Sequence, residues 1–323
     1  MGLSVAIIGL GVMGQRMLTN MAKHPDFTLK VAWDPDQTAC AKTASEYAPI
    51  EIETSAMAAI ERDDVDVIYI ASPPVSHRTY AIAAAKAGKV VFCEKPLGVD
   101  IADSRSLVEE VEKYGVPNAV NFPFADSAAI NLIESRLTNG SIGDVKSVDL
   151  RLHFARWPRG WQHSASWLSQ RAEGGYVREV GSHYVYLIEK LFGKASLLDA
   201  SVKYQDDPIL CETHFTANLK VAEDIPVSLV GGSGGVGPDR VEFTIWGSKS
   251  SMRLYDWVNV QSTTGEQWQE ELQHIPDRRE DGYVRMLDAF SNLCTGKPNQ
   301  LPPLRAALSV QEMVEEILAR ERQ

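Results

Sequence analysis

What decides the fold of this chain is the stretch Leu3-Ser4-Val5-Ala6-Ile7-Ile8-Gly9-Leu10-Gly11-Val12-Met13-Gly14. Its first six residues form the apolar run of a buried strand, and the pattern Gly-x-Gly-x-x-Gly follows at once. Gly9 permits a tight turn, Gly11 lets the backbone approach a pyrophosphate, and Gly14 lets the next helix pack close to the strand. The glycine pattern alone is a weak signal, but between a strand and a helix with free N-terminal N–H groups it predicts a dinucleotide site.

An acidic residue, Asp34, ends the next expected strand at the spacing that such a site requires. A carboxylate at this place bonds the adenosine ribose hydroxyls and repels a 2′-phosphate, so we expect NAD as the cofactor in preference to NADP. No arginine stands beside it in Trp33-Asp34-Pro35-Asp36 to reverse that preference. The alternative is that Asp34 only initiates an Asp-Pro turn. The residues expected at this part of the cofactor site are Gly9, Gly11, Val12, Met13, Gly14 and Asp34.

The chain divides by its rhythm into two expected domains. Residues 1–122 alternate short apolar runs with helical patterns, which predicts a parallel sheet of βαβ units, an α/β Rossmann domain. Its expected strands are 3–8, 28–33, 65–71, 89–93 and 117–122, and its expected helices are 12–23, 37–47, 76–87 and 103–114. Residues 123–323 predict an α+β domain with an open, largely antiparallel sheet. There we expect helices at 127–138, 176–191, 281–294 and 303–321, a strand at 145–154 and a glycine-rich hairpin connection at 231–238.

Composition excludes several classes of function. The net charge of −11 argues against a nucleic-acid partner, because such proteins need a basic surface to release counterions. The four cysteines of the chain lie far apart and form no Cys-x-x-Cys pair. We therefore expect free thiols and no metal site. The apolar N-terminal run lacks the basic region and cleavage site of a signal peptide, and no apolar run is long enough to span a bilayer. We therefore expect a cytoplasmic protein with neither a nucleic acid nor a membrane as its partner.

Glu94-Lys95-Pro96 follows the fourth strand, and further motifs lie at Ala71–His77, Asn121-Phe122, Gly140–Val145 and Glu179–His183. Together these motifs resemble the Gfo/Idh/MocA family of glucose–fructose oxidoreductases and inositol dehydrogenases, of which Glu-Lys-Pro is the most specific mark. The resemblance implies a Rossmann domain followed by an open-sheet α/β domain, and an activity on sugars, cyclic polyols or related carbonyl compounds. The further cofactor-binding residues implied by the resemblance are Ser72, Pro73, His77, Glu94, Lys95, Pro96 and Asn121.

Three residues are the expected catalytic groups. Lys95 follows a parallel strand at its carboxyl end, where ligands bind in such sheets, and its ammonium can stabilise negative charge on a reacting oxygen. Glu179 and His183 are four residues apart on an expected helix, so the carboxylate can orient the imidazole while His183 moves a proton. From spacing alone a solvated surface pair would be favoured; the family resemblance reverses that preference.

The match to the family departs from its usual pattern in this helix. The pattern is Asp-x-Gly-x-His-x-x-Asp, whereas here Glu179 replaces the first aspartate and Tyr186 the last. Tyr186 is therefore a candidate substrate contact. At the domain junction, Pro123 stands where a basic residue usually follows Asn121. Gly181 costs about 1 kcal/mol in mid-helix relative to alanine, which we attribute to close approach of cofactor or substrate.

A basic, tryptophan-rich loop spans residues 150–172, although the whole chain is acidic. One hypothesis is that its tryptophans stack on a sugar ring while an arginine clamps a carboxylate or phosphate. The alternative is Arg–Trp packing at a subunit interface. The candidate substrate contacts from this region are Trp157, Trp161, Trp167 and Arg178.

These features together predict reversible hydride transfer between NAD and a sugar or polyol, with Lys95 holding the reacting oxygen and His183 moving the proton. Two alternatives remain: a nucleotide-sensing regulatory protein that binds NAD without turnover, and an NAD-dependent glycosidase that oxidises its substrate transiently. An exposed sheet face in the second domain would need covering, which favours a homodimer or homotetramer.

Overall fold

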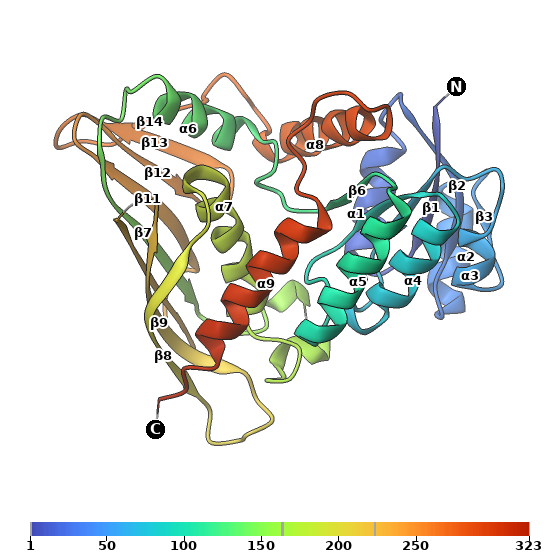
Figure 1. Ribbon diagram of the computed structural model, residues 1–323, viewed down its shortest axis with the longest axis horizontal. Coiled ribbons are helices and arrows are strands. Elements are labelled where there is room, and N and C mark those ends of the chain that lie inside the picture. Colours follow the sequence, from blue (N-terminus) through green and yellow to red (C-terminus); the bar gives the residue numbers. More distant parts are fainter. Residues whose placement is uncertain (1, 163–164, 223, 323) are drawn as a thin grey trace. The chain divides into compact units, whose positions relative to one another are not determined.

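The computed structural model describes residues 2–162, 165–222 and 224–322 of the chain (Figure 1). They form two compact units, Met1–Asp126 with Tyr283–Ser309, and Ser127–Gly282 with Val310–Gln323. The segment Tyr283–Ser309 thus belongs to the first unit, although the sequence alone groups it with the second domain. Within the ranges described, no helix is both long and apolar enough to cross a membrane.

The first unit is built on a six-stranded parallel sheet in the order β3-β2-β1-β4-β5-β6. This is the strand order of a doubly wound dinucleotide-binding fold, and it confirms the fold class expected for the first domain. Its strands are β1 (Leu3–Ile8), β2 (Phe27–Trp33), β3 (Glu51–Ile52), β4 (Val67–Ile70), β5 (Val90–Cys93) and β6 (Asn118–Val120). The helices between them are α1 (Val12–Met21), α2 (Gln37–Glu46), α3 (Ala56–Ile60), α4 (Pro74–Lys86) and α5 (Ile101–Tyr114).

Two elements of this unit, β3 and α3, were not expected from the sequence. A strand of two residues and a helix of five are too short to show a hydrophobic period. The local signal that does exist is Ser55, whose side chain accepts a hydrogen bond from the Ala58 N–H and so caps α3.

A late segment of the chain completes the core of the first unit. Phe290 of α8 (Arg278–Cys294) is fully buried and stacks on Phe92 of β5, with ring centroids 4.3 Å apart. It also stacks on Phe27 of β2 at 5.7 Å. At the same helix, Asp288 lies 3.2 Å from the Nε2 atom of His24. These contacts explain why Tyr283–Ser309 returns to the first unit.

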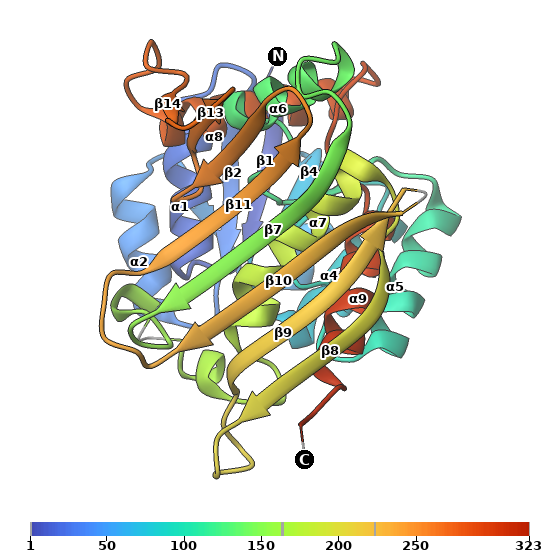
Figure 2. The same ribbon diagram turned by 90° about the vertical axis from the view of Figure 1, so that its left-hand side faces the viewer.

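The second unit is built on an eight-stranded sheet in the order β14-β13-β12-β11-β7-β10-β9-β8. Only β7 and β10 pair in parallel, and the other pairs are antiparallel, as expected. Figure 2 views the face of this sheet that α7 does not cover. The strands are β7 (Val145–Phe154), β8 (Ser196–Tyr204), β9 (Glu212–Val221), β10 (Ile225–Ser233), β11 (Arg240–Gly247), β12 (Ser251–Tyr255), β13 (Asn259–Thr263) and β14 (Gln269–Glu270), and the helices are α6 (Ala128–Thr138), α7 (Ser182–Phe192) and α9 (Leu304–Leu318).

The interpretation of residues 231–238 as a hairpin connection is wrong. Strand β10 continues to Ser233, and β7 lies between β10 and β11, so the two strands are not hairpin partners. Gly231 belongs to the strand for a packing reason, because a β-carbon there would lie 2.3 Å from the Phe215 ring and 2.9 Å from the Tyr176 ring. The glycine therefore admits two aromatic side chains, which the sequence pattern does not reveal.

Replacing Phe290 by alanine should lower the free energy of unfolding by about 3–5 kcal/mol, because it removes a fully buried ring that stacks on two others. Urea unfolding followed by circular dichroism measures the change. The matched control on the same helix is Val284→Ala, whose side chain is 49% exposed and whose loss should cost less than about 0.5 kcal/mol. Equal effects of the two variants would contradict this account of the core.

Candidate active site

The glycine turn between β1 and α1 has two positions that packing forces to be glycine. Gly9 has φ +99, and a β-carbon there would lie 2.6 Å from the backbone of Ala71 and Ser72. A β-carbon on Gly14 would lie 2.0 Å from the carbonyl oxygen of Gly9. At Gly11 the opposite holds, since an added β-carbon would meet no described atom within 4 Å. Gly9 and Gly14 thus bring helix and strand together, and Gly11 leaves open space at the helix start.

The first N–H groups of α1 are suited to an anion. The N-cap is Gly11, no described side chain caps the helix, and its first turn holds no acidic residue. Val12, the first residue of the helix, is 44% exposed. An uncapped helix N-terminus at a glycine turn is the arrangement that binds pyrophosphate, so the residues present fit a dinucleotide cofactor.

Asp34 lies at the carboxyl end of β2 and has a structural role as well as the expected one. Its Oδ2 accepts a hydrogen bond from the Leu10 N–H at 2.6 Å, and its Oδ1 accepts one from the Asp36 N–H at 2.8 Å. The first bond ties the glycine turn to β2, and the second forms the Asx turn that sequence reasoning offered as the alternative. Each carboxylate oxygen has a second lone pair, which leaves acceptors for ribose hydroxyls.

His77 joins the loops that follow β4 and β5. Its ring nitrogens lie 2.8 Å from the carbonyl oxygen of Ser72 and 2.9 Å from that of Pro96, and the residue is 1% exposed. Burial lowers the pKa of His77, although its hydrogen bonds with the carbonyl groups of Ser72 and Pro96 oppose this effect. The side chain is enclosed between protein groups, so the geometry favours a role in holding the two loops over direct contact with a cofactor. Ser72 and Pro73 begin the loop into α4, where Pro73 is the N-cap.

Lys95 follows β5 at the same carboxyl edge of the sheet as the glycine turn, and it is half-buried. Beneath it, Glu94 is 5% exposed and its Oε1 accepts hydrogen bonds from the Tyr69 hydroxyl and, at 2.7 Å, from Asn121 Nδ2. Burial and the charge of Glu94 hold the pKa of Tyr69 well above its usual range, so the phenol stays a donor. Glu94 and Asn121 thus fix the backbone before Lys95, and Tyr69 is a member that sequence reasoning missed.

The second unit carries Glu179 and His183 on a helix that is not uniform. The sequence predicts one α-helix over 176–191, but the structure has a π-helical turn over Val177–Gly181, followed by α7. Glu179 lies in the wide turn and is half-buried, and His183 lies in the first turn of α7 and is 7% exposed. Single π-turns inside helices occur frequently at functional sites because they displace side chains from the regular helical positions.

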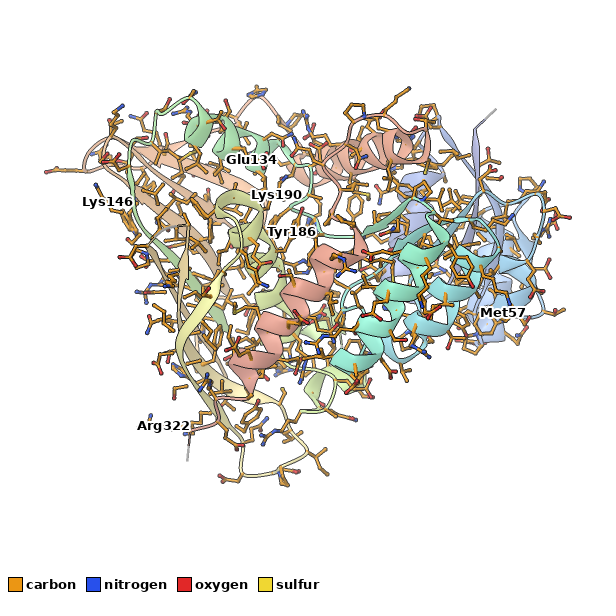
Figure 3. All side chains as sticks on the ribbon, viewed as in Figure 1. Met57, Glu134, Lys146, Tyr186, Lys190 and Arg322 are labelled. Atoms are coloured by element: carbon orange, nitrogen blue, oxygen red, sulfur yellow. The ribbon has the colours of Figure 1, made fainter. Side chains whose placement is uncertain are left out.

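The same helix presents Tyr186 and Lys190 further along (Figure 3). Tyr186 is 6% exposed, and Lys190 pairs with Glu134 of α6 at 3.0 Å. Lys190 therefore anchors α7 to α6. Gly181 has ordinary helical φ, and a β-carbon there would make only ordinary van der Waals contacts with described atoms, at 3.5 Å from Val177 and 4.0 Å from the Tyr176 carbonyl oxygen. The packing described for the chain thus gives no steric reason for Gly181, and close approach of a ligand stays a prediction.

The basic loop reaches Glu179 through a glutamine that sequence reasoning missed. Gln162 is buried, donates from Nε2 to Glu179 Oε1 at 3.4 Å, and accepts at Oε1 from Arg159 Nε at 3.0 Å. The Arg159 guanidinium lies over the Trp161 ring, 4.9 Å from its centroid. Trp161 is 48% exposed. Residues 163 and 164 of the loop lie outside the described residues.

The remaining candidates from this region are held by the chain itself. Trp157 donates from Nε1 to the Leu168 carbonyl oxygen at 2.9 Å and packs on Tyr176, and Trp167 is half-buried. Arg178 donates from Nε and Nη2 to the two carboxylate oxygens of Glu315, at 2.6 and 2.8 Å, and from Nη1 to two loop carbonyl oxygens. This geometry gives Arg178 a role in holding the loop, and we do not carry it forward as a substrate contact.

A buried acid, Glu212 of β9, supports the start of the π-helical turn. It is 1% exposed, and its Oε1 accepts the Val177 N–H at 2.8 Å. A β-carbon on Gly175 would lie 2.2 Å from its Oε2, so this glycine admits the carboxylate. Burial raises the pKa of Glu212 to about 7, although the Val177 N–H opposes that rise. Sequence reasoning missed Glu212 because its partner lies 35 positions earlier in the chain.

Among the described residues, no group of three or more histidine, cysteine, aspartate or glutamate side chains is placed to hold a metal ion. The expected catalytic residues lie in different units, Lys95 in the first and Glu179 and His183 in the second.

Comparison with protein families gives matches over both units. A Gfo/Idh/MocA model described as an oxidoreductase family with an NAD-binding Rossmann fold matches residues 3–122. A second model, described as the C-terminal alpha/beta domain of the same oxidoreductase family, matches residues 134–323. Together the two models span most of the chain.

Individual relatives are more distant. A dTDP-3,4-didehydro-2,6-dideoxy-alpha-D-glucose 3-reductase of Streptomyces violaceoruber is 30% identical over 212 residues, 63% of this chain and 60% of that protein. A 2,7-anhydro-N-acetylneuraminate hydratase of Mediterraneibacter gnavus is 24% identical over 312 residues, 93% of this chain and 80% of that protein. For three of the curated relatives, this reductase among them, the match spans only 44 to 60% of the relative's own length.

A solved structure of similar fold is the 3-ketoreductase KijD10 of Actinomadura kijaniata in complex with NADP and TDP-benzene. Its TM-score is 0.82 at 18% identity, and the match covers 100% of this chain and 98% of that one. At this level of identity the likeness concerns the fold.

Changing Glu212 to glutamine should remove a pH dependence of stability. Because the pKa of Glu212 is raised from 4.5 to about 7 in the folded chain, its contribution is fully present below pH 4.5 and is lost as the pH rises through 7. The native protein should lose about 1.4 kcal/mol per pH unit in this window relative to Glu212→Gln, which keeps the acceptor for Val177. Urea unfolding between pH 4 and about 9 measures the difference. The control is Glu61→Gln, at an exposed position; parallel curves for native and Glu212→Gln proteins would exclude the titration.

Proposed function

The chain belongs to the Gfo/Idh/MocA oxidoreductase family, and from this premise we propose that it is a nicotinamide-dependent enzyme that transfers hydride to or from a sugar, a cyclic polyol or a related carbonyl compound. The observation that carries the proposal is the position of Lys95 at the carboxyl edge of the parallel sheet that also bears the glycine turn and Asp34. Cofactor and reacting oxygen are thereby served by one edge of one sheet.

The cofactor would be held by the N–H groups at Val12 and Met13, with Gly11 giving room for the pyrophosphate and Asp34 accepting from the adenosine ribose. When bound, the nicotinamide supplies or accepts the hydride. His77 and Asn121 fix the loop backbone near Ser72, Pro73 and Pro96, as described above.

In the proposed reaction Lys95 donates a hydrogen bond to the reacting oxygen of the substrate and stabilises negative charge on it. His183 accepts the hydroxyl proton during oxidation and returns it during reduction. Glu179, held by Gln162, orients His183 or contacts the substrate with its longer side chain. Trp161, exposed beside Arg159, would provide an aromatic face for a sugar ring, and Trp157 and Trp167 of the same loop and Tyr186 of α7 are the further candidate contacts.

NAD is the cofactor that we propose, because a carboxylate at the end of β2, as Asp34 provides, would accept from the adenosine ribose hydroxyls and repel a 2′-phosphate. The related fold of the 3-ketoreductase was solved with NADP. The cofactor preference of this chain is therefore open to a direct test at Asp34.

A reaction without net oxidation is a second candidate function, and the name of one relative favours it. A relative that matches 93% of this chain is named a hydratase, and the addition of water involves no net oxidation. Transient oxidation of the substrate, as in the alternative of an NAD-dependent glycosidase, would use the same groups and release no NADH. A regulatory protein of the same fold would bind NAD without any turnover that depends on Lys95.

We also propose that the protein is a cytoplasmic homodimer or homotetramer. The four cysteines are free thiols, which suits a reducing compartment. No described helix lies over the sheet face that Figure 2 views, and Trp246 of β11 in this sheet is 40% exposed. A second copy of the chain would cover this face.

Changing Lys95 to methionine should lower kcat at least about a hundredfold, because the variant keeps the length of the side chain and loses the charge that stabilises the oxygen. A screen of aldoses, inositols, sugar acids and dihydrodiols with NAD and NADP measures turnover. Lys86→Met, at an exposed position on α4, is the matched control. NAD binding should survive in both variants; substrate turnover that is unchanged in Lys95→Met would refute the proposed role.

Changing Asp34 to serine should reduce the ratio of kcat/KM with NAD to kcat/KM with NADP at least about tenfold, because it removes the charge that repels a 2′-phosphate. The affinity for NAD should fall as well, since Leu10 loses its acceptor. Asp36→Ser is the control, because serine keeps the cap of α2 and removes a neighbouring carboxylate. A native enzyme that prefers NADP, or an unchanged ratio, would overturn the assignment.

A further inference from the structure

We propose that Trp257, on the turn between β12 and β13, is a further residue of this site and positions the imidazole of His183. The inference rests on the proposed function, in which His183 moves the proton. The structural basis of the inference is independent of the sequence motifs. Trp257 lies 74 positions after His183 (257 − 183) and belongs to none of those motifs.

The contact itself is direct. The rings of Trp257 and His183 have centroids 5.3 Å apart and are inclined at 80°, an edge-to-face arrangement. The same indole lies 5.8 Å from the ring of Tyr184, the next residue of α7. Because neighbouring residues of a helix point in different directions, an indole that meets both covers the start of α7 at this place.

The backbone of the turn shows that the position of this tryptophan is costly. Asp256 has φ +46 and Trp257 has φ +75, in the left-handed region that bulky residues rarely adopt. Hairpin turns that need such angles usually carry glycine or asparagine. A turn selected only for folding would not place tryptophan there, so the contacts of its side chain are the reason that the structure offers.

The turn is held rigidly on both sides. Tyr255 and Asn259 pair across it, the Asp256 N–H donates to the Val241 carbonyl oxygen at 3.0 Å, and Arg278 donates to Asn259 Oδ1 at 2.6 Å. The indole is half-buried. Trp257 therefore presents a fixed surface to His183.

A fixed neighbour matters because a helix does not by itself orient an imidazole. The final torsion of histidine has broad, roughly two-fold minima, so the ring plane is set by what surrounds it. Proton transfer needs the ring nitrogen within hydrogen-bond reach of the substrate hydroxyl. An edge-to-face contact with the rigid indole selects one ring plane, which makes Trp257 a positioning residue in the proposed mechanism.

The kinetic test compares Trp257→Leu with the conservative variant Trp257→Phe. We expect the leucine variant to lose about ten- to hundredfold in kcat with KM changed less than about threefold, because the ring plane is lost and substrate binding is kept. Phenylalanine keeps an aromatic contact and should retain kcat within about threefold. A leucine variant with native kcat would overturn the proposal, and so would a phenylalanine variant that is as slow as leucine.

The control for folding is Trp268→Leu, which removes the indole just before β14 that packs on Trp246 of β11. Thermal unfolding is measured on all variants. If Trp257→Leu fails to fold, Trp257→Phe replaces it in both measurements: its kcat should stay within about threefold, and the weaker ring current of phenylalanine should move the His183 resonances, whereas unmoved resonances would overturn the proposal.

A second readout does not need turnover. The ring protons of His183, assigned in the NMR spectrum with a His183→Gln variant, should be displaced by the ring current of Trp257 in the native protein. They should move in Trp257→Leu and stay in Trp268→Leu. If the His183 resonances are displaced but the protein turns over no substrate, the proposed function is wrong and the contact between Trp257 and His183 stands. If the resonances do not respond to Trp257→Leu, the positioning role is wrong.

Discussion

The close approach of α1 to β1 is the constraint on which the rest of the first unit depends. A β-carbon on Gly14 would lie 2.0 Å from the Gly9 carbonyl oxygen, so helix and strand meet backbone to backbone. This contact fixes the N-terminus of α1 at the carboxyl edge of the sheet, and the bond from Leu10 to Asp34 fixes the adjoining strand against it. Lys95 reaches the same edge because β5 is parallel to β1. The packing of α1 thus sets the place of the glycine turn, and the parallel sheet brings Lys95 to the same edge.

In the second unit, Glu179 and His183 lie on a helix whose first turn is irregular. A π-turn satisfies fewer regular hydrogen bonds, so it needs support from outside the helix. Glu212 accepts the Val177 N–H below the turn, and Trp257 packs on His183 beyond it. Gln162 reaches Glu179 from the basic loop. Each of these residues comes from a different part of the chain.

How much the sequence reveals follows from the range of each interaction. The strand over Leu3–Ile8 and the glycine turn carry local signals, apolar runs and backbone demands, and they could be predicted. Glu212 and Trp257 could not, because their importance comes from partners far along the chain. The same limit applies to Arg178, a candidate substrate contact by its place beside Glu179. The sequence motif does not show that it pairs with Glu315, 137 positions away. A histidine motif can be read locally, whereas the groups that hold it in place cannot.

The central claim is that the chain moves a hydride between nicotinamide and a carbon that bears a hydroxyl group, with the oxygen held by Lys95. The most direct measurement uses a panel of sugars and polyols deuterated at carbon, incubated with the protein and NAD, followed by mass spectrometry of the nicotinamide. The account predicts deuterium on the nicotinamide with the native protein and at least about a hundredfold slower transfer with Lys95→Met. Tight NAD binding with no deuterium transfer from any member of the panel would contradict it.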